Sequence, residues 1–418
     1  MVNRKLTLAT MGFAAVAVLG SVTAQTDPAA TSTGTARAPR VRPATAAVVP
    51  TGSGANFGDP LPNLTAQQFA DFAEGLEDFQ EEDTAASGLG PIFNNVSCVA
   101  CHSAPAIGGS GATTVTRFGR FANGQFDPLA SEGGSLLQAR AIDPRVQEVI
   151  PADANVVAKR ITTPLFGLGL IEAIPDSAII LNALGPKPDN ISGRISIVSD
   201  VASGNTRVGR FGWKAQQATL LAFAGDAYLN EIGITNRLFP TENAPNGNTK
   251  LLAKYDHVAD PEDAVDPATG KADIDHFADF MRLLAPPPKL PLSPSASAGQ
   301  SLFSQIGCAG CHQPTFVTGP NAIAALDHKV VTLYSDLLLH DMGSLADGIA
   351  QGTARVSEMK TAPLWGLRAR GPYLHDGRAT TVSAAIRMHD GEAAAARDRF
   401  NRLGSTQQQQ LLAFLNGI

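Results

Sequence analysis

The chain has 418 residues, of which 44% are hydrophobic and 17% are charged, and its formal net charge at pH 7 is -6. This length suits two domains, or one domain with large insertions. The negative charge argues against nucleic acid as a partner and is ordinary for a soluble protein.

The N-terminus has the pattern of a secretory signal. Arg4 and Lys5 precede an apolar run over residues 6–19, and small residues follow at 22–24. The run is too short for a spanning helix, and the small residues mark a cleavage site. We therefore predict a signal peptide over residues 1–24 and no transmembrane span after its removal, with an uncleaved anchor as the alternative.

Residues 25–60 consist mainly of Ala, Thr, Pro, Gly and Ser, with almost no large apolar side chain. Such a segment buries too little surface to offset the entropy of ordering it, so we predict a disordered linker. An amphipathic helix is expected next, because Thr65 is a suitable N-cap and Phe69, Phe72, Leu76 and Phe79 share one helical stripe.

A Cys-x-x-Cys-His motif occurs twice, as Cys98, Cys101 and His102 and again as Cys308, Cys311 and His312. This is the signature of covalent haem c attachment. The two thiols bind the vinyl groups of the porphyrin, and the histidine becomes the fifth iron ligand. The motifs therefore predict two haem c groups, with His102 and His312 as iron ligands.

Two other uses of these cysteines deserve comparison with the haem prediction. A thioredoxin-like redox pair needs no second copy, and a zinc site needs no histidine fixed after each pair. The motifs contain all four cysteines of the chain, so no thiol remains for a separate disulfide framework. Export agrees with haem c, which is attached in the periplasm of Gram-negative bacteria.

The remainder of the first half is less regular. Residues 103–134 are rich in glycine, and we predict loops along a haem edge. Residues 191–213 predict a β-hairpin with its turn at Gly204, and residues 216–232 predict a long amphipathic helix. Four arginines are candidates for pairing with haem propionates: Arg117, Arg120, Arg140 and Arg160.

Helices are predicted over residues 274–284, 296–306 and 407–415. The pattern of Pro-Leu-Phe-Gly-Leu at residues 164–168 returns as Pro-Leu-Trp-Gly-Leu at 363–367, which indicates a duplicated unit. The predicted fold is mainly α, with two cytochrome c-like haem domains, the first with insertions that include the β-hairpin. The predicted boundaries are 61–285 for the first domain, 286–294 for a proline-rich linker and 295–418 for the second domain.

The two halves differ in their supply of a sixth iron ligand. After His102 the next histidine is His257, followed by His276, and no methionine occurs between Met11 and Met281. The second half offers several candidates: His328, His340, Met342, Met359, His375, Met388 and His389. The difference predicts an open first haem that binds a small oxidant and a capped second haem that passes electrons. The alternative is two electron-transfer haems, the first capped by His257 or His276.

Several segments resemble the di-haem oxidoreductase family, whose members were once called thiol oxidoreductases. They are SDLLLHDMG at 335–343, YLHDGR at 373–378 and HDGEA at 389–393, with residues 166–175 and 209–215 in the first half. The family is related to bacterial di-haem cytochrome c peroxidases, MauG-type enzymes and rubber oxygenase. The resemblance covers essentially everything after the linker.

The resemblance implies a cap for the second haem. In the peroxidase relatives this ligand lies twelve residues past a His-x-Gly turn, which from Gly377 reaches His389. Met388 and Met342 are the runners-up, and a predicted helix over residues 382–387 would aim the His389 side chain inward. Without the resemblance, His389 would be interpreted as an exposed histidine at a helix end.

The resemblance also implies roles for other side chains. Glu172 is the candidate for the distal acid that shuttles protons in the relatives, with a structural pair to an arginine as the alternative. Trp213, or less favourably Trp365, is the candidate for an electron relay between the haems, although a tryptophan is more often core. His340 and His375 hold positions that are architectural in the relatives.

The implied function is that of a periplasmic di-haem c oxidoreductase of peroxidase type. A small cytochrome or other donor would supply electrons at the second haem, and peroxide or another small oxidant would be reduced at the first. The alternatives are a dioxygen-dependent oxygenase of the rubber-oxygenase type and a non-catalytic electron-transfer cytochrome. The relatives' removable distal histidine has no counterpart here, which puts their reductive activation in doubt. Their calcium ion has no recognisable ligand cluster in this sequence, so calcium stays open.

Overall fold

The computed structural model describes residues 56–418. The predicted signal peptide and the linker up to residue 55 lie outside the described residues. The last five linker residues belong to the fold, because the Phe57 ring packs edge-on against Phe166 at 5.4 Å and Pro60 forms an isolated β-bridge with Leu284.

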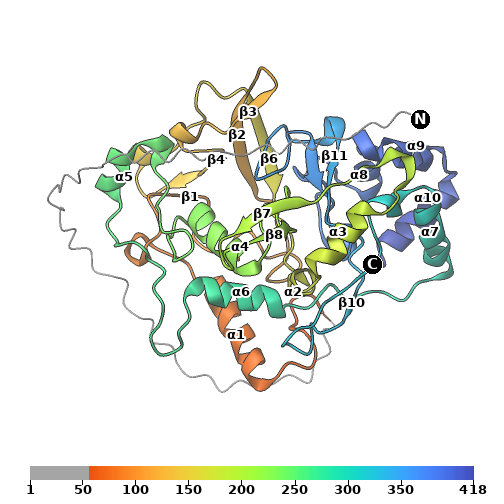
Figure 1. Ribbon diagram of the computed structural model, residues 1–418, viewed down its shortest axis with the longest axis horizontal. Helices are drawn as coiled ribbons and strands as arrows, with labels where there is room; N and C mark the ends of the chain where they lie inside the picture. Colours follow the sequence, from red (N-terminus) through yellow and green to blue (C-terminus); the bar gives the residue numbers. More distant parts are fainter. Residues whose placement is uncertain (1–55) are drawn as a thin grey trace, which may run out of the picture. The chain divides into compact units, whose positions relative to one another are not determined.

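The chain forms helices throughout the described residues (Figure 1). They are α1 (Ala66–Gln80), α2 (Leu168–Glu172), α3 (Asp176–Leu184), α4 (Leu220–Ala227), α5 (Thr249–Tyr255), α6 (Asp273–Leu283), α7 (Pro294–Gln305), α8 (Val382–Arg387), α9 (Ala394–Arg402) and α10 (Ser405–Leu415). Strands form small antiparallel sheets between them. They are β1 (Ile92–Phe93), β2 (Thr114–Ala122), β3 (Gln125–Asp127), β4 (Leu136–Leu137), β5 (Arg140–Ala141), β6 (Val156–Ile161), β7 (Ser196–Asp200), β8 (Asn205–Gly209), β9 (Phe316–Val317), β10 (Val330–Val331), β11 (Leu339–Asp341) and β12 (Glu358–Lys360).

Two pairs of helices cross in close contact, α1 with α6 in the first half and α7 with α10 in the second (Figure 1). Both crossings depend on a glycine. A Cβ added to Gly75 of α1 would lie 2.2 Å from the His276 carbonyl oxygen of α6, and one added to Gly299 of α7 would lie 1.9 Å from that of Gln410. Only glycine permits so close an approach of two backbones.

The sequence repeat is also a repeat of backbone geometry. Gly167 has φ 72° and ψ 13°, and Gly366 has φ 73° and ψ 14°, and each stands directly before a short helix. The Gly167 amide donates to the Leu284 carbonyl after α6, and the Gly366 amide donates to Ile418 after α10. Each Pro-Leu-x-Gly segment is therefore bonded to the backbone just after the last helix of its own half, which is α6 in the first half and α10 in the second.

The predicted helices are present with shifts of a few residues. Thr65 caps α1 as expected, since its Oγ1 accepts from the Gln68 amide at 3.2 Å and its own amide donates to Gln68 Oε1 at 3.0 Å. The helix predicted over residues 216–232 begins later, at Leu220, and ends in a π-helical turn at Tyr228–Ile232.

The β content is larger than predicted, which corrects the mainly α expectation in part. The hairpin of the first half is confirmed as β7 and β8. The loop predicted over residues 103–134 is wrong in its middle, where β2 pairs with β3, β4 and β6. Thr116 and Phe118 of β2 are buried, and Gly119 leaves room for the Phe126 ring of β3.

The main hydrophobic core takes side chains from both halves of the chain. Leu333, Leu337, Leu338 and Trp365 pack there with residues of the first half. A smaller core lies among α7, α9 and α10. The prolines between the halves are packed as well, since Pro286 lies against Gly167 and Pro287 against Gly366. The predicted domain boundaries stay a prediction.

Candidate functional site

Each Cys-x-x-Cys-His motif forms one tight helical turn. The His102 amide donates to the Cys98 carbonyl at 3.1 Å, and the His312 amide donates to the Cys308 carbonyl at 2.9 Å. All four cysteines are free of disulfides. Burial raises the pKa of the Cys98 thiol, and that of Cys308 to about 12, which is opposite to the low pKa of a reactive redox thiol.

The two motif histidines have the same hydrogen bond. Nδ1 of His102 lies 3.1 Å from the Gly109 carbonyl oxygen, and Nδ1 of His312 lies 2.9 Å from that of Tyr334. A carbonyl only accepts, so Nδ1 carries the proton and Nε2 keeps its lone pair for a metal. Burial lowers the pKa of both imidazoles to about 4, which keeps them neutral as iron ligands must be.

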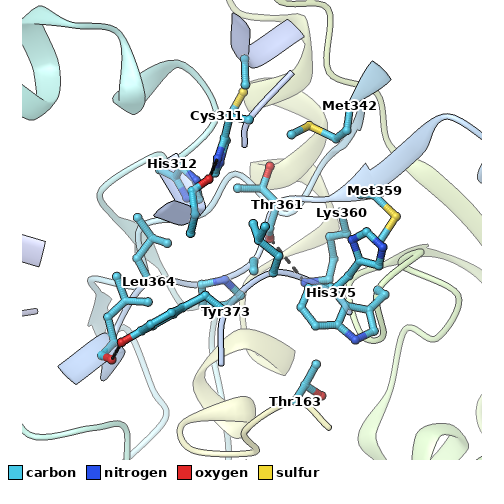
Figure 2. A pocket seen from close by; sticks show the side chains of 18 of the residues that line it. Thr163, Cys311, His312, Met342, Met359, Lys360, Thr361, Leu364, Tyr373 and His375 are labelled. Atoms are coloured by element: carbon cyan, nitrogen blue, oxygen red, sulfur yellow. Dashed lines mark hydrogen bonds between the residues drawn. The ribbon is translucent and has the colours of Figure 1, made fainter. Parts of the chain in front are cut away.

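A cavity of about 260 Å³ surrounds the second motif. Figure 2 shows Cys311 and His312 on one side of it and Met359, Lys360 and His375 on another. Its walls come from both halves of the chain, because Ser110, Ile161, Thr163 and Trp213 line it together with residues of the second half.

His389 lies opposite His312 in this cavity. The two ring centres are 6.5 Å apart, and His389 Nδ1 lies 2.8 Å from the Ala385 carbonyl oxygen, so its Nε2 is also left for a metal. With metal–nitrogen distances of about 2 Å, two axial imidazoles on one ion have ring centres about 6 Å apart. The pair therefore fits the two axial ligands of one haem iron, and the helix predicted before His389 is α8.

The runners-up for this ligand are placed differently. Met388 is 40% exposed at the end of α8. Met342 lines the cavity, as does the buried Met359.

Two partly buried cations in the cavity wall, Arg370 and Lys360, fit the carboxylates of a haem. Arg370 and Lys360 form no salt bridge with any described residue, and Arg370 Nε is buried without a hydrogen-bond partner there. Burial lowers the pKa of Arg370 to about 10 and that of Lys360 to about 8. A haem brings two propionates, which would supply the missing negative charge.

His340 and His375 also surround this cavity. His340 is held by two carboxylates, with Nε2 2.9 Å from Asp336 Oδ2 and Nδ1 2.7 Å from Glu392 Oε2. These partners raise its pKa to about 12, and an imidazolium cannot bind iron. His375 packs edge-on against Trp213, with ring centres 6.3 Å apart. Both contacts agree with architectural positions.

The candidate caps of the first haem, His257 and His276, have no recorded ring contact with His102 among the described residues. His257 is exposed. His276 is buried at the α1–α6 crossing, where its Nδ1 lies 3.8 Å from Glu74 Oε2 and 3.9 Å from Asp78 Oδ2. Among the described residues, the His312 ring contacts the ring of a second histidine, His389, whereas the His102 ring contacts Phe79 and no histidine ring.

Glu172 has contacts that describe a structural residue. Its Oε1 accepts from the Leu220 amide at 2.7 Å, and its Oε2 accepts from Arg282 Nε at 2.8 Å. It therefore ties α2 to α4 and α6. These contacts agree with the alternative of a pair with an arginine, and the role of Glu172 as a proton shuttle stays a prediction.

A different acidic group lies beside the first motif, and sequence reasoning missed it. Glu231 acts electrostatically on Cys101, and Arg117 of β2 acts on Glu231 and Asp226. Burial raises the pKa of both carboxyls, and Asn94 Nδ2 donates to Glu231 Oε2 at 2.7 Å. Arg117 Nε is buried without a hydrogen-bond partner among the described residues. Nothing in the spacing of these three side chains indicates that they meet.

The other arginines proposed for propionates have protein partners. Arg160 pairs with Asp347, whose Oδ2 lies 2.7 Å from its Nη2, in a buried salt bridge. Arg120 pairs with Asp127 and Asp153, and Arg140 donates to Asn95.

The surroundings of the two motifs are directly connected. Ser110 directly follows Gly109, whose carbonyl oxygen accepts from the His102 ring. Thr163 and Ser110 both line the cavity of His312. Trp213 lines the same cavity, where its Nε1 donates to the Ile161 carbonyl at 3.1 Å.

A zinc site does not fit the cysteines. Over residues 56–418, one group of potential metal-binding side chains has donor atoms close enough together to hold an ion. That group contains only carboxylates and no cysteine. Two separate haem sites therefore describe the motifs better than one four-cysteine metal site.

The model of the family "Di-haem oxidoreductase, putative peroxidase" matches residues 140–418. No curated protein matches the chain. Among helices of the described part, none is both long enough and apolar enough to cross a membrane.

Solved structures similar to this chain include xenon-pressurised hydrazine synthase of Kuenenia stuttgartiensis, at 14% identity over 90% of this chain and 100% of the other, with a TM-score of 0.41. A MauG-like protein associated with microbial copper homeostasis matches at 14% identity, over 83% and 88% of the two chains, with a TM-score of 0.36. The di-haem peroxidase BthA of Burkholderia thailandensis matches at 14% identity over 83% and 85%, with a TM-score of 0.39.

Proposed function

The chain belongs to the di-haem oxidoreductase family, and from this premise we propose that it is a periplasmic c-type di-haem enzyme that reduces peroxide. The observation that carries the proposal is the unequal surroundings of the two motif histidines. His312 faces His389 at 6.5 Å, whereas His102 has no such partner among the described residues.

The residues present fit two haem groups. Cys98 and Cys101 would bind the first, with His102 as its iron ligand. Cys308 and Cys311 would bind the second, His312 and His389 would hold its iron, and Arg370 and Lys360 would neutralise its propionates. When bound, the two haems supply the electron transfer and the reduction of the oxidant.

The chain itself supplies protons beside the first site. Reduction of peroxide to two waters consumes two electrons and two protons, and the reacting oxygens need a proton donor at neutral pH. Glu231 and Asp226 suit this role because burial raises the pKa of each carboxyl, while Arg117 nearby supplies positive charge.

The second site is closed for relay rather than for substrate. His312 and His389 would both bind the iron of this haem and would leave it no free position for a small molecule. Ser110, Thr163 and Trp213 form part of the wall of this cavity, and Ser110 directly follows Gly109, whose carbonyl oxygen accepts from His102. Electrons from a small cytochrome or comparable donor would cross this wall, and Trp213 is one candidate for the path.

A spectroscopic test separates this function from that of a plain electron carrier. The oxidised protein should show one high-spin and one low-spin haem by EPR, and cyanide should bind one haem per chain. Hydrogen peroxide should then be consumed with a reduced cytochrome as donor. Two low-spin haems that bind neither cyanide nor carbon monoxide would remove the catalytic proposal. Consumption of dioxygen without peroxide turnover would favour an oxygenase instead.

A further inference from the structure

Three carboxylates converge outside the haem sites. Glu242, Asp260 and Glu262 each bring an oxygen to within 4.8 Å of the other two. Asp260 is exposed, whereas Glu242 is 7% exposed and Glu262 is 2% exposed. The residues come from the loops between the π-helical turn after α4 and the start of α6.

One oxygen of this cluster has no protein partner. Glu242 Oε1 accepts from the Asn243 amide at 3.1 Å, but its Oε2 is buried without a hydrogen bond from any described residue. Glu262, by contrast, accepts from the Thr235 amide at 2.7 Å. A buried acceptor without a partner is costly, so a further group is expected at Glu242.

No positive side chain of the described residues forms a salt bridge with these three acids. Burial and the neighbouring Glu262, Asp260 and Asp256 raise the pKa of Glu242 to about 9. Three carboxyl groups are collected here in a largely buried site, and a cation would relieve both the repulsion between their ionised forms and the missing contact of Glu242.

We propose that Glu242, Asp260 and Glu262 bind a calcium ion. The donor set is all oxygen, without histidine or cysteine, which excludes the usual zinc and copper sites and favours a hard cation. Calcium accepts flexible sets of six to eight oxygens, whereas magnesium demands near-ideal octahedral geometry. The exposed Asp260 gives the ion a way in. All three residues belong to the first half of the chain.

The ion would link the segment before the first Cys-x-x-Cys-His motif to the start of α6. Glu262 packs against Gly88, which precedes the motif, since a Cβ on Gly88 would lie 2.7 Å from Glu262. The next residue, Asp263, accepts from the Asp273 amide at 2.8 Å and from the Ile274 amide at 3.3 Å at the start of α6. Calcium binding should therefore stabilise this half of the protein.

The test uses the full holoprotein, stripped with EGTA and titrated with calcium chloride in a calorimeter. We expect one ion per chain and a rise of several degrees in the unfolding temperature. Glu242→Gln and Asp260→Asn should each weaken binding at least tenfold. The matched control is Glu82→Gln, which neutralises an exposed acid outside the cluster and should leave binding unchanged.

Several outcomes would overturn the site. They are no calcium uptake by the stripped protein, full uptake by both cluster variants, or tighter binding of magnesium than of calcium. Because Asp260 is exposed, its variant keeps the test decisive if Glu242→Gln does not fold. If Glu242→Gln stabilises the protein and calcium does not, the cluster holds protons rather than a metal.

Discussion

The three histidines proposed as iron ligands are each held in place by the same kind of contact. Nδ1 of His102, His312 and His389 lies 2.8 to 3.1 Å from a backbone carbonyl oxygen, of Gly109, Tyr334 and Ala385 respectively. Such a contact sets the tautomer and the orientation before any metal arrives.

The role of His389 can be tested by removing its side chain. In His389→Gly the second haem should change from low-spin to high-spin, because the position opposite His312 is vacated. EPR and visible spectra measure the change, and added imidazole should restore the low-spin form. The neighbouring variant Met388→Leu, at an exposed side chain, should change nothing. An unaltered spectrum in His389→Gly would remove it from the ligand set.

Glu231 and Glu172 make opposite predictions. Glu231→Gln should lower peroxide turnover by about 100-fold or more, which is the usual contribution of general acid–base catalysis, without changing the haem spectrum. Glu172→Gln should lower thermal stability, because its contacts to Leu220 and Arg282 weaken, and should keep turnover within about twofold. Stopped-flow peroxide assays and thermal melts distinguish the two, and the reverse pattern would restore Glu172 as the acid.

His340 should make stability depend on pH. Asp336 and Glu392 raise its pKa to about 12, so the stabilisation is complete below the unfolded value near 6.5 and is lost as pH rises towards 12. His340 in turn helps to hold the pKa of Glu392 at about 2, and that contribution is lost as pH falls below about 4.5. Melting temperatures of wild type and His340→Gln should therefore differ most between about pH 4.5 and 6.5. A constant difference from pH 5 to 10 would contradict this assignment.

At this scale the sequence predicts the local geometry of the two motifs better than the position of proton-donating side chains. The motif residues are neighbours in the chain, so their spacing defines their geometry. The partners of Glu231 come from β2, α4 and the segment before the first motif, and only the tertiary fold brings them together. Glu172 looked suitable because it stands beside a repeated motif, but its pairing with Arg282 of α6 depends on helix packing.

At the scale of elements, the helices follow local periodicity and the sheets do not. The stripe of α1 and the apolar faces of α6, α7 and α10 lie within single segments, which is why their bounds were predictable. The strand β2 is stabilised by pairing with β6, which lies more than thirty residues further along the chain. The sequence of β2 contains Gly119, a residue type that is more common in loops than in strands. Pairing at such a distance leaves little trace in local composition.

The helix crossings give a prediction for each half. Gly75→Ala and Gly299→Ala place a methyl group against a backbone carbonyl, and each should destabilise the protein by about 1–3 kcal/mol. The first should disturb the spectrum of the first haem and the second that of the second haem. Chemical denaturation and haem spectra measure both effects. Gly185→Ala, whose nearest contact would be 3.4 Å away at a negative φ, is the control. Crossings that tolerate alanine would show that the helices are less tightly packed.

At the scale of the whole molecule, the halves depend on each other more than a tether between domains requires. The second cavity takes part of its wall from Ser110, Ile161 and Trp213, and the main core takes Leu337 and Trp365 from the second half. The proline segment between the halves lies against both repeated glycine turns. Composition alone marks that segment as a boundary but gives no sign of this packing.

The second half should therefore not behave as an independent cytochrome. Exported alone as residues 295–418, it should attach haem but aggregate, because apolar side chains that pack with the first half become exposed. Size-exclusion chromatography with haem absorbance measures this, and the full chain is the control. A monomeric half with an unchanged low-spin spectrum would show that the shared walls are dispensable.

The repeated glycine turns have an evolutionary consequence. Between Gly366 and Ile418 the chain is short, whereas the corresponding stretch from Gly167 to Leu284 carries the hairpin, α4 with its π turn and the carboxylate loops. After a duplication, one copy could thus accept an insertion between two fixed backbone positions without a change in the residues that would hold its haem. The first half could then acquire reactivity towards an oxidant, while the second half kept electron transfer as its function.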